Sequence, residues 1–223
     1  MSEEVAPSAR AAVASQRIAD QIRERILAGH LMPGTRIIQD EIAEELGASR
    51  LPVREALRIL QSAGLVTLKS NSGAWVSSMT PRDCELSYTM RERLEPLLLA
   101  ESMLKLTIDD IVQIDAIQTE IEQTDDVEEF LVLDRRLHWA TYQHHDADEL
   151  ATFVARLWDT TQHYRRAFTH LAGAKRRWII VSEHQLLIEA LRDRDVQTAQ
   201  NVLAMHIRRT RVELAQHPEV FTS

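Results

Sequence analysis

Hydrophobic residues follow the period of an α-helix over most of the chain, with polar residues on the opposite face. In the segment 50–60, four apolar positions fall on one helical face: Val53, Ala56, Leu57 and Leu60. The same spacing predicts a first helix over residues 15–28 and a second over 40–46. From residue 81 onward it predicts six more helices, at 81–104, 108–124, 126–145, 147–171, 173–193 and 195–216. Six helices with no strand pattern between them predict an all-α bundle.

Two short segments before the bundle have the composition of strands. They lie at 65–69 and 74–76 and enclose a turn that ends at Gly73. Gly47 separates the helix at 40–46 from the next one, so a helix, a tight turn and a second helix precede this hairpin. A hairpin in that place is a wing. The predicted fold class is therefore mainly α, with an N-terminal winged helix-turn-helix that has a small β wing and a C-terminal all-α six-helix bundle.

Length and composition agree with two folded domains. The chain has 223 residues, of which 44% are hydrophobic, and this is enough for one large or two modest cores. Residues 1–14, rich in Ala and Ser, are expected to form a mobile tail. Residues 15–78 are expected to form the winged-helix domain, and residues 79–223 the helical domain.

The second helix of the helix-turn-helix presents a basic face. Ser49 is a suitable N-cap residue, and Arg50, Arg54 and Arg58 follow at intervals of four. Three guanidiniums on one helical face are typical of a helix that enters the major groove of DNA with its N-terminal end. The alternative is an ordinary solvated basic face, since arginine spacing alone does not identify a contact with DNA.

The charge distribution limits how strongly such a domain would bind DNA. The net charge is −8, but residues 1–78 carry nine Lys and Arg against nine Asp and Glu, so the remainder carries 17 against 25. A neutral domain with one basic edge predicts modest non-specific binding and a dependence on dimerisation for affinity. The single Cys84 excludes an intramolecular disulfide, and no apolar run approaches the ~20 residues that span a bilayer. These observations predict a cytoplasmic protein without a membrane partner.

One carboxylate and three imidazoles lie at positions that can face the interior of the bundle. Asp134 and His138 are four apart and share a helical face, while His184 and His206 each have apolar neighbours at helical spacing. If the three helices meet, this set suits Zn²⁺, Ni²⁺ or Mn²⁺ and leaves positions for water or a ligand. Spacing alone leaves open that each histidine is a core or surface residue and that Asp134 pairs with Arg135.

The N-terminal part of the chain, residues 12–78, resembles the winged-helix head of the GntR family of bacterial transcription regulators. The resemblance is carried by Pro33-Gly34, the run from Ser49 to Leu60, Gly64-Leu65-Val66, and Gly73. It implies that the domain binds double-stranded DNA, with Arg50 and Arg54 reading bases. The full set of implied DNA-binding residues is Ser49, Arg50, Arg54, Arg58, Lys69 and Gly73. Asp40 stands where some members of the family carry a basic residue.

Residues 80–216 resemble the FCD effector domain of the FadR subfamily of these regulators. The family pattern of an Asp-x-x-x-His pair, a Glu-His and a His-Ile implies a divalent metal bound by Asp134, His138, His184 and His206. Arg91 matches the arginine that takes the carboxylate of an effector, and the alternative is a surface pair with Glu95. Six helices rather than seven place the domain near the branch typified by vanillate regulators.

These features predict a ligand-responsive bacterial transcription regulator, a repressor, that binds a palindromic operator as a homodimer. The helical domain would then serve dimerisation and the binding of a small carboxylic acid at the metal. One alternative is a regulator for which the metal ion itself is the signal. Another is an enzyme whose metal activates water, with Glu183 beside His184 as the obvious candidate base.

Overall fold

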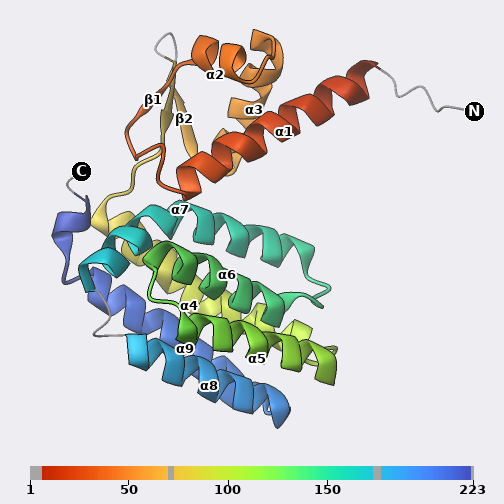
Figure 1. Ribbon diagram of the computed structural model, residues 1–223, viewed down its shortest axis with the longest axis vertical. Coiled ribbons are helices and arrows are strands. Elements are labelled where there is room, and N and C mark those ends of the chain that lie inside the picture. Colours follow the sequence, from red (N-terminus) through yellow and green to blue (C-terminus); the bar gives the residue numbers. More distant parts are fainter. Residues whose placement is uncertain (1–6, 70–72, 173–176, 222–223) are drawn as a thin grey trace, which may run out of the picture. The chain divides into compact units, whose positions relative to one another are not determined.

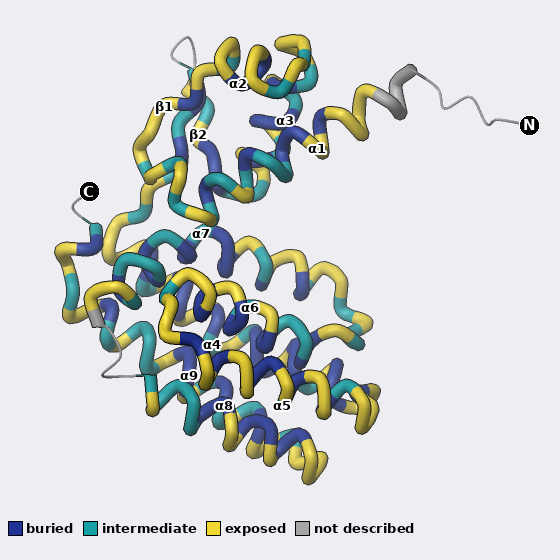
Figure 2. The backbone as a smooth tube through the Cα atoms, in the orientation of Figure 1, coloured by how far each residue is buried: buried dark blue, intermediate teal, exposed yellow. Residues whose placement is uncertain are grey.

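The structure, a computed structural model, describes residues 7–69, 73–172 and 177–221. Its internal contacts divide the chain into two units, and the boundary between them lies between Ser78 and Met79. Each unit has a hydrophobic core of its own. Figure 1 shows the elements of both units, and Figure 2 shows which parts of each are buried.

The described part of the first unit consists of three helices and a three-stranded sheet (Figure 1). The elements are α1 (Pro7–Leu27), β1 (Arg36–Ile37), α2 (Gln39–Glu45), α3 (Arg50–Ser62), β2 (Val66–Lys69) and β3 (Gly73–Val76). The strands are antiparallel in the order β1-β3-β2, and Trp75 of β3 lies opposite Arg36 on one side and Thr67 on the other. Helices followed by this hairpin confirm the predicted winged helix-turn-helix.

Helix α1 begins earlier than the sequence pattern predicts. It starts at Pro7, so the expected mobile tail over residues 1–14 is wrong for residues 7–14, while residues 1–6 lie outside the described part of the chain. Residues 11–14 are mostly alanine, which has the highest intrinsic helix propensity. A composition interpreted as that of a tail therefore extends the first helix.

The core of the first unit forms where α1 packs on α3. The apolar stripe predicted for α3 is fully buried and consists of Val53, Ala56, Leu57 and Leu60. The opposite face of α3, which carries its arginines, is exposed. Packing of the apolar stripe thus decides which side of α3 is available to a partner.

Six α-helices and a short 3₁₀ helix form the described part of the second unit (Figure 1). They are α4 (Pro81–Met103), α5 (Ile108–Gln123), α6 (Val127–Tyr142), α7 (Asp148–Ala172), α8 (Arg177–Arg192), α9 (Val196–Leu214) and the 3₁₀ helix Pro218–Phe221. The all-α six-helix bundle is confirmed. The expected start of the fifth of these helices at residue 173 lies outside the described residues.

Capping boxes set the beginnings of α4 and α5. The Thr80 hydroxyl accepts a hydrogen bond from the backbone N–H of Asp83, and the Asp83 carboxylate accepts one from the backbone N–H of Thr80. Thr107 and Asp110 make the same pair of bonds at α5. These bonds satisfy N–H groups that have no partner within a helix. Helix α4 therefore starts directly after the boundary between the units.

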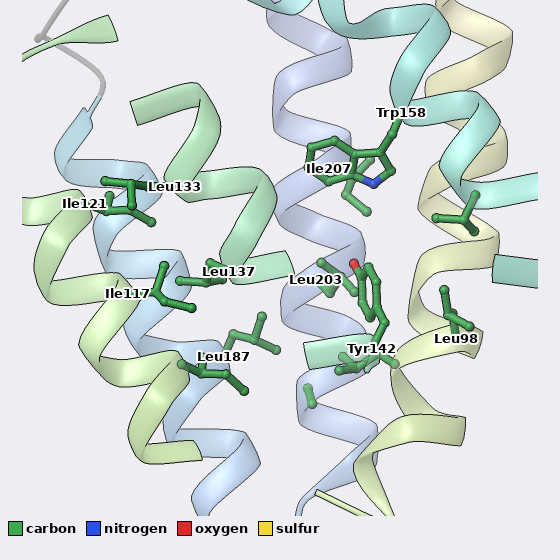
Figure 3. Close-up of a cluster of buried hydrophobic side chains, with 14 of the residues drawn as sticks. Leu98, Ile117, Ile121, Leu133, Leu137, Tyr142, Trp158, Leu187, Leu203 and Ile207 are labelled. Atoms are coloured by element: carbon green, nitrogen blue, oxygen red, sulfur yellow. The ribbon is translucent and has the colours of Figure 1, made fainter. Parts of the chain in front are cut away.

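The core of the bundle is built mainly on α4, which packs along α9 and α7. Figure 3 shows part of this core, with Leu98 from α4, Leu137 from α6 and Ile207 from α9. Tyr142 and Trp158 are fully buried among these apolar side chains. Among the described helices, none combines the length and the apolar character that crossing a membrane requires.

Replacing Leu57 by Ala should destabilise the first unit by about 2–5 kcal/mol, because it leaves a cavity at the contact between α1 and α3. The matched control is Leu51→Ala on the same helix, where the side chain is 58% exposed and the expected change is within about 0.5 kcal/mol. Thermal unfolding followed by circular dichroism measures both. Equal midpoints for the two variants would contradict the buried packing of α3.

Candidate metal centre and DNA-binding face

Three helices of the bundle bring one carboxylate and three imidazoles to one buried place. Asp134 and His138 lie on α6, His184 on α8 and His206 on α9, and the possible ligand atoms of the four lie within 4.8 Å of one another. The three ring centroids are 5.5, 5.2 and 5.0 Å apart. Oxygens of Asp134 lie 3.6 Å from His184 Nε2 and 3.8 Å from His138 Nε2. The structure thus brings together the four residues that spacing alone places on separate helices.

Each imidazole of the cluster is oriented by a contact at Nδ1. The contacts are Gln118 Oε1 for His184 at 2.9 Å, Glu183 Oε2 for His206 at 2.9 Å and the Tyr142 hydroxyl for His138 at 3.3 Å. Since an amide oxygen and an ionised carboxylate only accept hydrogen bonds, His184 and His206 donate through Nδ1 and keep Nε2 as the basic nitrogen. Metal-binding histidines are commonly held in this way. None of these three contacts is evident from the sequence, apart from the spacing of four between His138 and Tyr142.

Polar atoms of the cluster are buried without a hydrogen bond to any described residue. They are Oδ1 of Asp134 and Nε2 of His184, whereas Oδ2 of Asp134 is in contact with a guanidinium. Such an atom costs on the order of 1–3 kcal/mol when it is left without a partner, so a bound group that uses its lone pairs is expected. Three imidazole nitrogens and a carboxylate suit a divalent metal such as Zn²⁺, Ni²⁺ or Mn²⁺. The cluster could therefore hold a metal ion, although its donors do not select one of the three.

A guanidinium from α7 also contacts the cluster. Arg165 Nη2 lies 2.6 Å from Asp134 Oδ2, and both side chains are buried. Burial acts to raise the pKa of Asp134, but attraction to Arg165 and to the three histidines together outweighs it and holds the pKa of this carboxyl below its usual range. The alternative pairing of Asp134 with Arg135 is wrong, because Arg135 instead pairs with Asp159 of α7 at 2.7 Å.

Arg91, the predicted effector-binding residue, lies in a second buried pair on α4. Its Nε donates to Glu95 Oε1 at 2.5 Å, and its Nη1 donates to Thr161 Oγ1 at 3.4 Å. The guanidinium also lies 4.0 Å from the ring centroid of Trp158. The expected alternative, a surface pair of Arg91 with Glu95, is correct about the partner and wrong about the location, because both side chains are buried.

Hydrogen bonds connect this second pair with the metal cluster. The Tyr142 hydroxyl donates to Glu95 Oε2 at 2.9 Å, and His138 Nδ1 lies 3.3 Å from the same hydroxyl. Burial, and then the Glu95 carboxylate, raise the pKa of Tyr142 well above its ordinary value, so the hydroxyl keeps its proton. Tyr142 therefore lies between the Arg91–Glu95 pair and one of the possible metal ligands.

A cavity of about 80 Å³ lies beside the cluster and is lined by residues of α6, α7, α8 and α9. Its walls include His206 and Glu183 together with the aromatic rings of Phe130 and Phe168. Glu183 Oε1 accepts a hydrogen bond from Arg209 Nε at 2.6 Å, while its other oxygen holds His206. Both carboxylate oxygens of Glu183 are thus occupied, one by His206 and the other by Arg209, so neither is available to act as a general base.

The arginine face of α3 is exposed, as predicted, and acidic residues accompany it. Arg50 Nε lies 2.6 Å from Asp40 of α2, and Arg58 Nη1 lies 3.1 Å from Glu55. Arg54 is more distant from Glu55, at 4.0 Å. Exposed ion pairs of this kind contribute little stability, so little free energy is needed to separate the arginines from these acids. Spacing along α3 gives no sign of the contribution from Asp40, which lies on another helix.

The remaining residues predicted to bind DNA lie at the start of α3 and in the wing. Ser49 occupies the N-cap position of α3, as expected, and its side chain makes no hydrogen bond to a backbone N–H of the helix. Lys69 Nζ lies 4.9 Å, and Arg36 Cζ 5.7 Å, from the centroid of the Trp75 ring. Gly73 has a φ of +107°, a conformation that favours glycine. Arg36 is a cation of the wing that helical spacing could not identify.

A helix-turn-helix with an exposed arginine face and a wing defines a DNA-binding transcription regulator. Residues 14–76 match the gntR family of bacterial regulatory proteins, and residues 86–209 match the FCD domain. The chain therefore belongs to the GntR family of bacterial transcription regulators, in the FadR-like subfamily that carries an FCD domain. The members of this family are regulators of transcription and not enzymes, which excludes the enzyme alternative.

Similar proteins extend over most of the chain. An uncharacterised HTH-type transcriptional regulator of Bacillus subtilis is 27% identical over 83% of this chain and 84% of its own length. The gluconate operon transcriptional repressor of the same organism is 27% identical over 80% of this chain and 76% of its own length. The solved structure of McbR/YncC from Escherichia coli has a TM-score of 0.82 at 23% identity and covers 92% of this chain and 98% of its own. At that identity the structural likeness supports the fold alone.

The stability of the metal-free protein should fall as the pH falls below ~6.5, the ordinary pKa of histidine. Burial lowers the pKa of His184 to about 3 and lowers that of His138 well below its ordinary value. Each histidine has one pKa in the folded chain and a higher one in the unfolded chain. Between these two values the unfolded chain binds a proton that the folded chain does not, so the free energy of unfolding falls. Each residue should remove about 1.4 kcal/mol per pH unit well below ~6.5.

Urea unfolding at a series of pH values tests this expectation. His184→Gln should reduce the slope by about one proton, since one buried imidazole is gone. The control is Gln185→Ala, at the exposed neighbour of His184 on α8, which removes no titratable group and should leave the slope unchanged. If the free energy of unfolding of the wild-type protein stays constant from pH 7 to pH 5, these imidazoles are not buried in the neutral form.

Proposed function

We propose that this GntR-family protein is a repressor that binds a near-palindromic operator as a homodimer and senses a small carboxylic acid at a metal-containing site. The buried donor cluster of Asp134, His138, His184 and His206 supports this most directly. Asp134 Oδ1 and His184 Nε2 are buried without a hydrogen bond to a described residue, and a divalent metal explains them best. A metal with four protein ligands keeps one or two positions for an organic acid.

For the DNA-binding half of the proposal, the exposed face of α3 enters the major groove. Arg50 and Arg54 read base edges, most simply those of guanine, because a guanidinium can donate two hydrogen bonds to O6 and N7. Arg58, Lys69 and the backbone at Gly73 contact phosphates or the minor groove. Ser49 lies beside Arg50 at the same end of the helix, where its hydroxyl can reach a phosphate.

For the sensing half, the acid binds the metal through one carboxylate oxygen and is oriented by Arg91. The short chain from Arg91 through Glu95 and Tyr142 to His138 supports this assignment, because it joins the arginine to a metal ligand. Guanidinium and carboxylate form strong two-point pairs. A bundle of six helices also fits the vanillate-regulator branch, and a role in binding DNA supports a cytoplasmic location.

Repression is proposed from the relatives. Two similar proteins, from Bacillus subtilis and Bacillus licheniformis, are named as repressors of the gluconate operon. In this mechanism the acid favours an arrangement of the two winged domains that no longer matches the operator, so that the acid relieves repression. The acid must bind the two arrangements with different affinity for this to occur.

Arg54→Ala should weaken specific operator binding by about 1–3 kcal/mol and relax the base preference at one position of each half-site. Fluorescence anisotropy with the operator and with base-substituted operators measures both effects. The matched control is Arg82→Ala, an exposed arginine at the start of α4 that removes the same charge outside the DNA-binding unit. If the two variants bind the operator equally well, α3 does not read bases through Arg54.

One small carboxylic acid should raise the melting temperature of the metal-loaded protein and lose this effect after treatment with a chelator. At 100 times its dissociation constant a ligand stabilises by about 2.7 kcal/mol, which is several degrees for a domain of this size. Thermal shift against a panel of acids measures this. A response to metal alone, with none to any acid, would favour the alternative in which the metal is the signal.

The same site can be tested in cells with an operator-controlled reporter. The His184→Ala variant should still repress the reporter but should no longer respond to the acid, since it lacks a metal ligand. Deletion of the regulator should switch the promoter on. A promoter that stays silent after deletion would contradict repression, and a His184→Ala protein that fails to fold would indicate a structural metal.

A further inference from the structure

Arg165 is the one described cationic side chain in direct contact with the carboxylate of the Asp134/His138/His184/His206 cluster. It reaches the cluster from α7, a helix that supplies none of the four donors. Its Nη2 lies 2.6 Å from Asp134 Oδ2, and its guanidinium lies 5.4 Å from the ring centroid of Trp158. The arginine is thus fixed between an aromatic ring and the carboxylate that a metal would use.

The pair of Asp134 and Arg165 is balanced in charge. The carboxylate of Asp134 is the one acidic group among the four donors, and Arg165 supplies its positive partner inside a largely apolar core. A buried carboxylate without such a partner would be strongly unfavourable.

A divalent metal would have to share this carboxylate with Arg165. Two positive charges on one buried carboxylate repel each other, and the repulsion is larger in the interior than in water. The guanidinium also withdraws electron density from the oxygen that would bind the metal. The contacts of Gln118 and Glu183 with the imidazoles act in the opposite direction, because acceptors at Nδ1 raise the basicity of the ligand nitrogen.

We propose that Arg165 is a built-in counter-cation of the cluster, which competes with the metal for Asp134 and makes metal binding weaker and readily reversible. The proposal rests on the metal site proposed above and adds a residue that opposes it. With the metal present, the buried positive charge exceeds the negative charge, so an organic anion near the metal offsets the excess. Binding of an anion should therefore also tighten binding of the metal.

The test is the affinity of Arg165→Gln for Zn²⁺, measured by competition with a chromophoric chelator in the absence of organic acids. Removal of the competing charge should lower the dissociation constant for Zn²⁺ by about tenfold, which is opposite in sign to the roughly 10–100-fold loss of affinity that follows when a supporting partner of a metal ligand is removed. Arg165→Lys, which keeps the charge but not the fork of donors, should lie between Arg165→Gln and the wild-type protein. An Arg165→Gln dissociation constant equal to or higher than that of the wild-type protein would overturn the proposal.

Two controls separate this proposal from the proposed function. Arg135→Gln removes a neighbouring arginine whose guanidinium lies 5.8 Å from the Trp158 ring and pairs with Asp159 instead of Asp134, so its affinity for Zn²⁺ should match the wild-type value. Asp134→Asn should bind Zn²⁺ far more weakly in every background. If the wild-type protein binds no divalent metal, the proposed metal site fails. If it binds metal and Arg165→Gln binds it no tighter, only the role of Arg165 fails.

Loss of Arg165 leaves a buried carboxylate without a partner, so the metal-free variant is expected to be less stable. Circular dichroism of this variant, recorded with and without Zn²⁺, then shows whether the metal restores the folded state. A variant that regains the wild-type spectrum when Zn²⁺ is added supports the proposal, because the metal then replaces the guanidinium as the partner of Asp134. A variant that stays unfolded in saturating Zn²⁺ overturns it and assigns Arg165 a purely structural role.

Discussion

The bundle depends on keeping one carboxylate charged in an apolar interior. Asp134 lies among side chains that cannot solvate it, so each polar group near it has a defined partner or a defined orientation. Arg165 compensates the charge of Asp134. The three imidazoles lie around this carboxylate, and the Nδ1 atom of each contacts Gln118, Glu183 or Tyr142. These contacts tie α5, α6, α7, α8 and α9 together at a single point. A core made of leucine and isoleucine alone would pack the same helices without fixing their register so narrowly.

The sequence was sufficient for the fold because the apolar period is long and regular. The apolar spacing at 15–28, 40–46 and 50–60 and in six segments after residue 81 identified every α-helix of the described part of the chain, but not the 3₁₀ helix Pro218–Phe221. Its failures have physical reasons. An alanine-rich start was interpreted as a tail, although alanine favours a helix.

The candidate site was predictable only in part, for a different reason. Asp134 and His138 are joined by helical spacing, but nothing local to α8 and α9 shows that His184 and His206 meet them, and the family resemblance supplied that link. Partners that come from a neighbouring helix had no sequence signal at all. Arg165 with Asp134 and Asp40 with Arg50 are of this kind. Long-range pairs depend on how helices pack, which a pattern along one helix does not specify.

Helix α4 has a position that gives the Arg91–Glu95 pair a wider importance. It begins at the Thr80 cap, directly after the boundary between the two units, and carries Arg91 in its third turn. The eleven helical steps from Thr80 to Arg91, each about 1.5 Å, correspond to a length of about 16 Å. A hydrogen-bonded helix is stiff, so a displacement imposed on Arg91 by a bound molecule would arrive at the first turn almost undiminished. The helix that carries the buried Arg91–Glu95 pair is therefore also the first helix of the bundle.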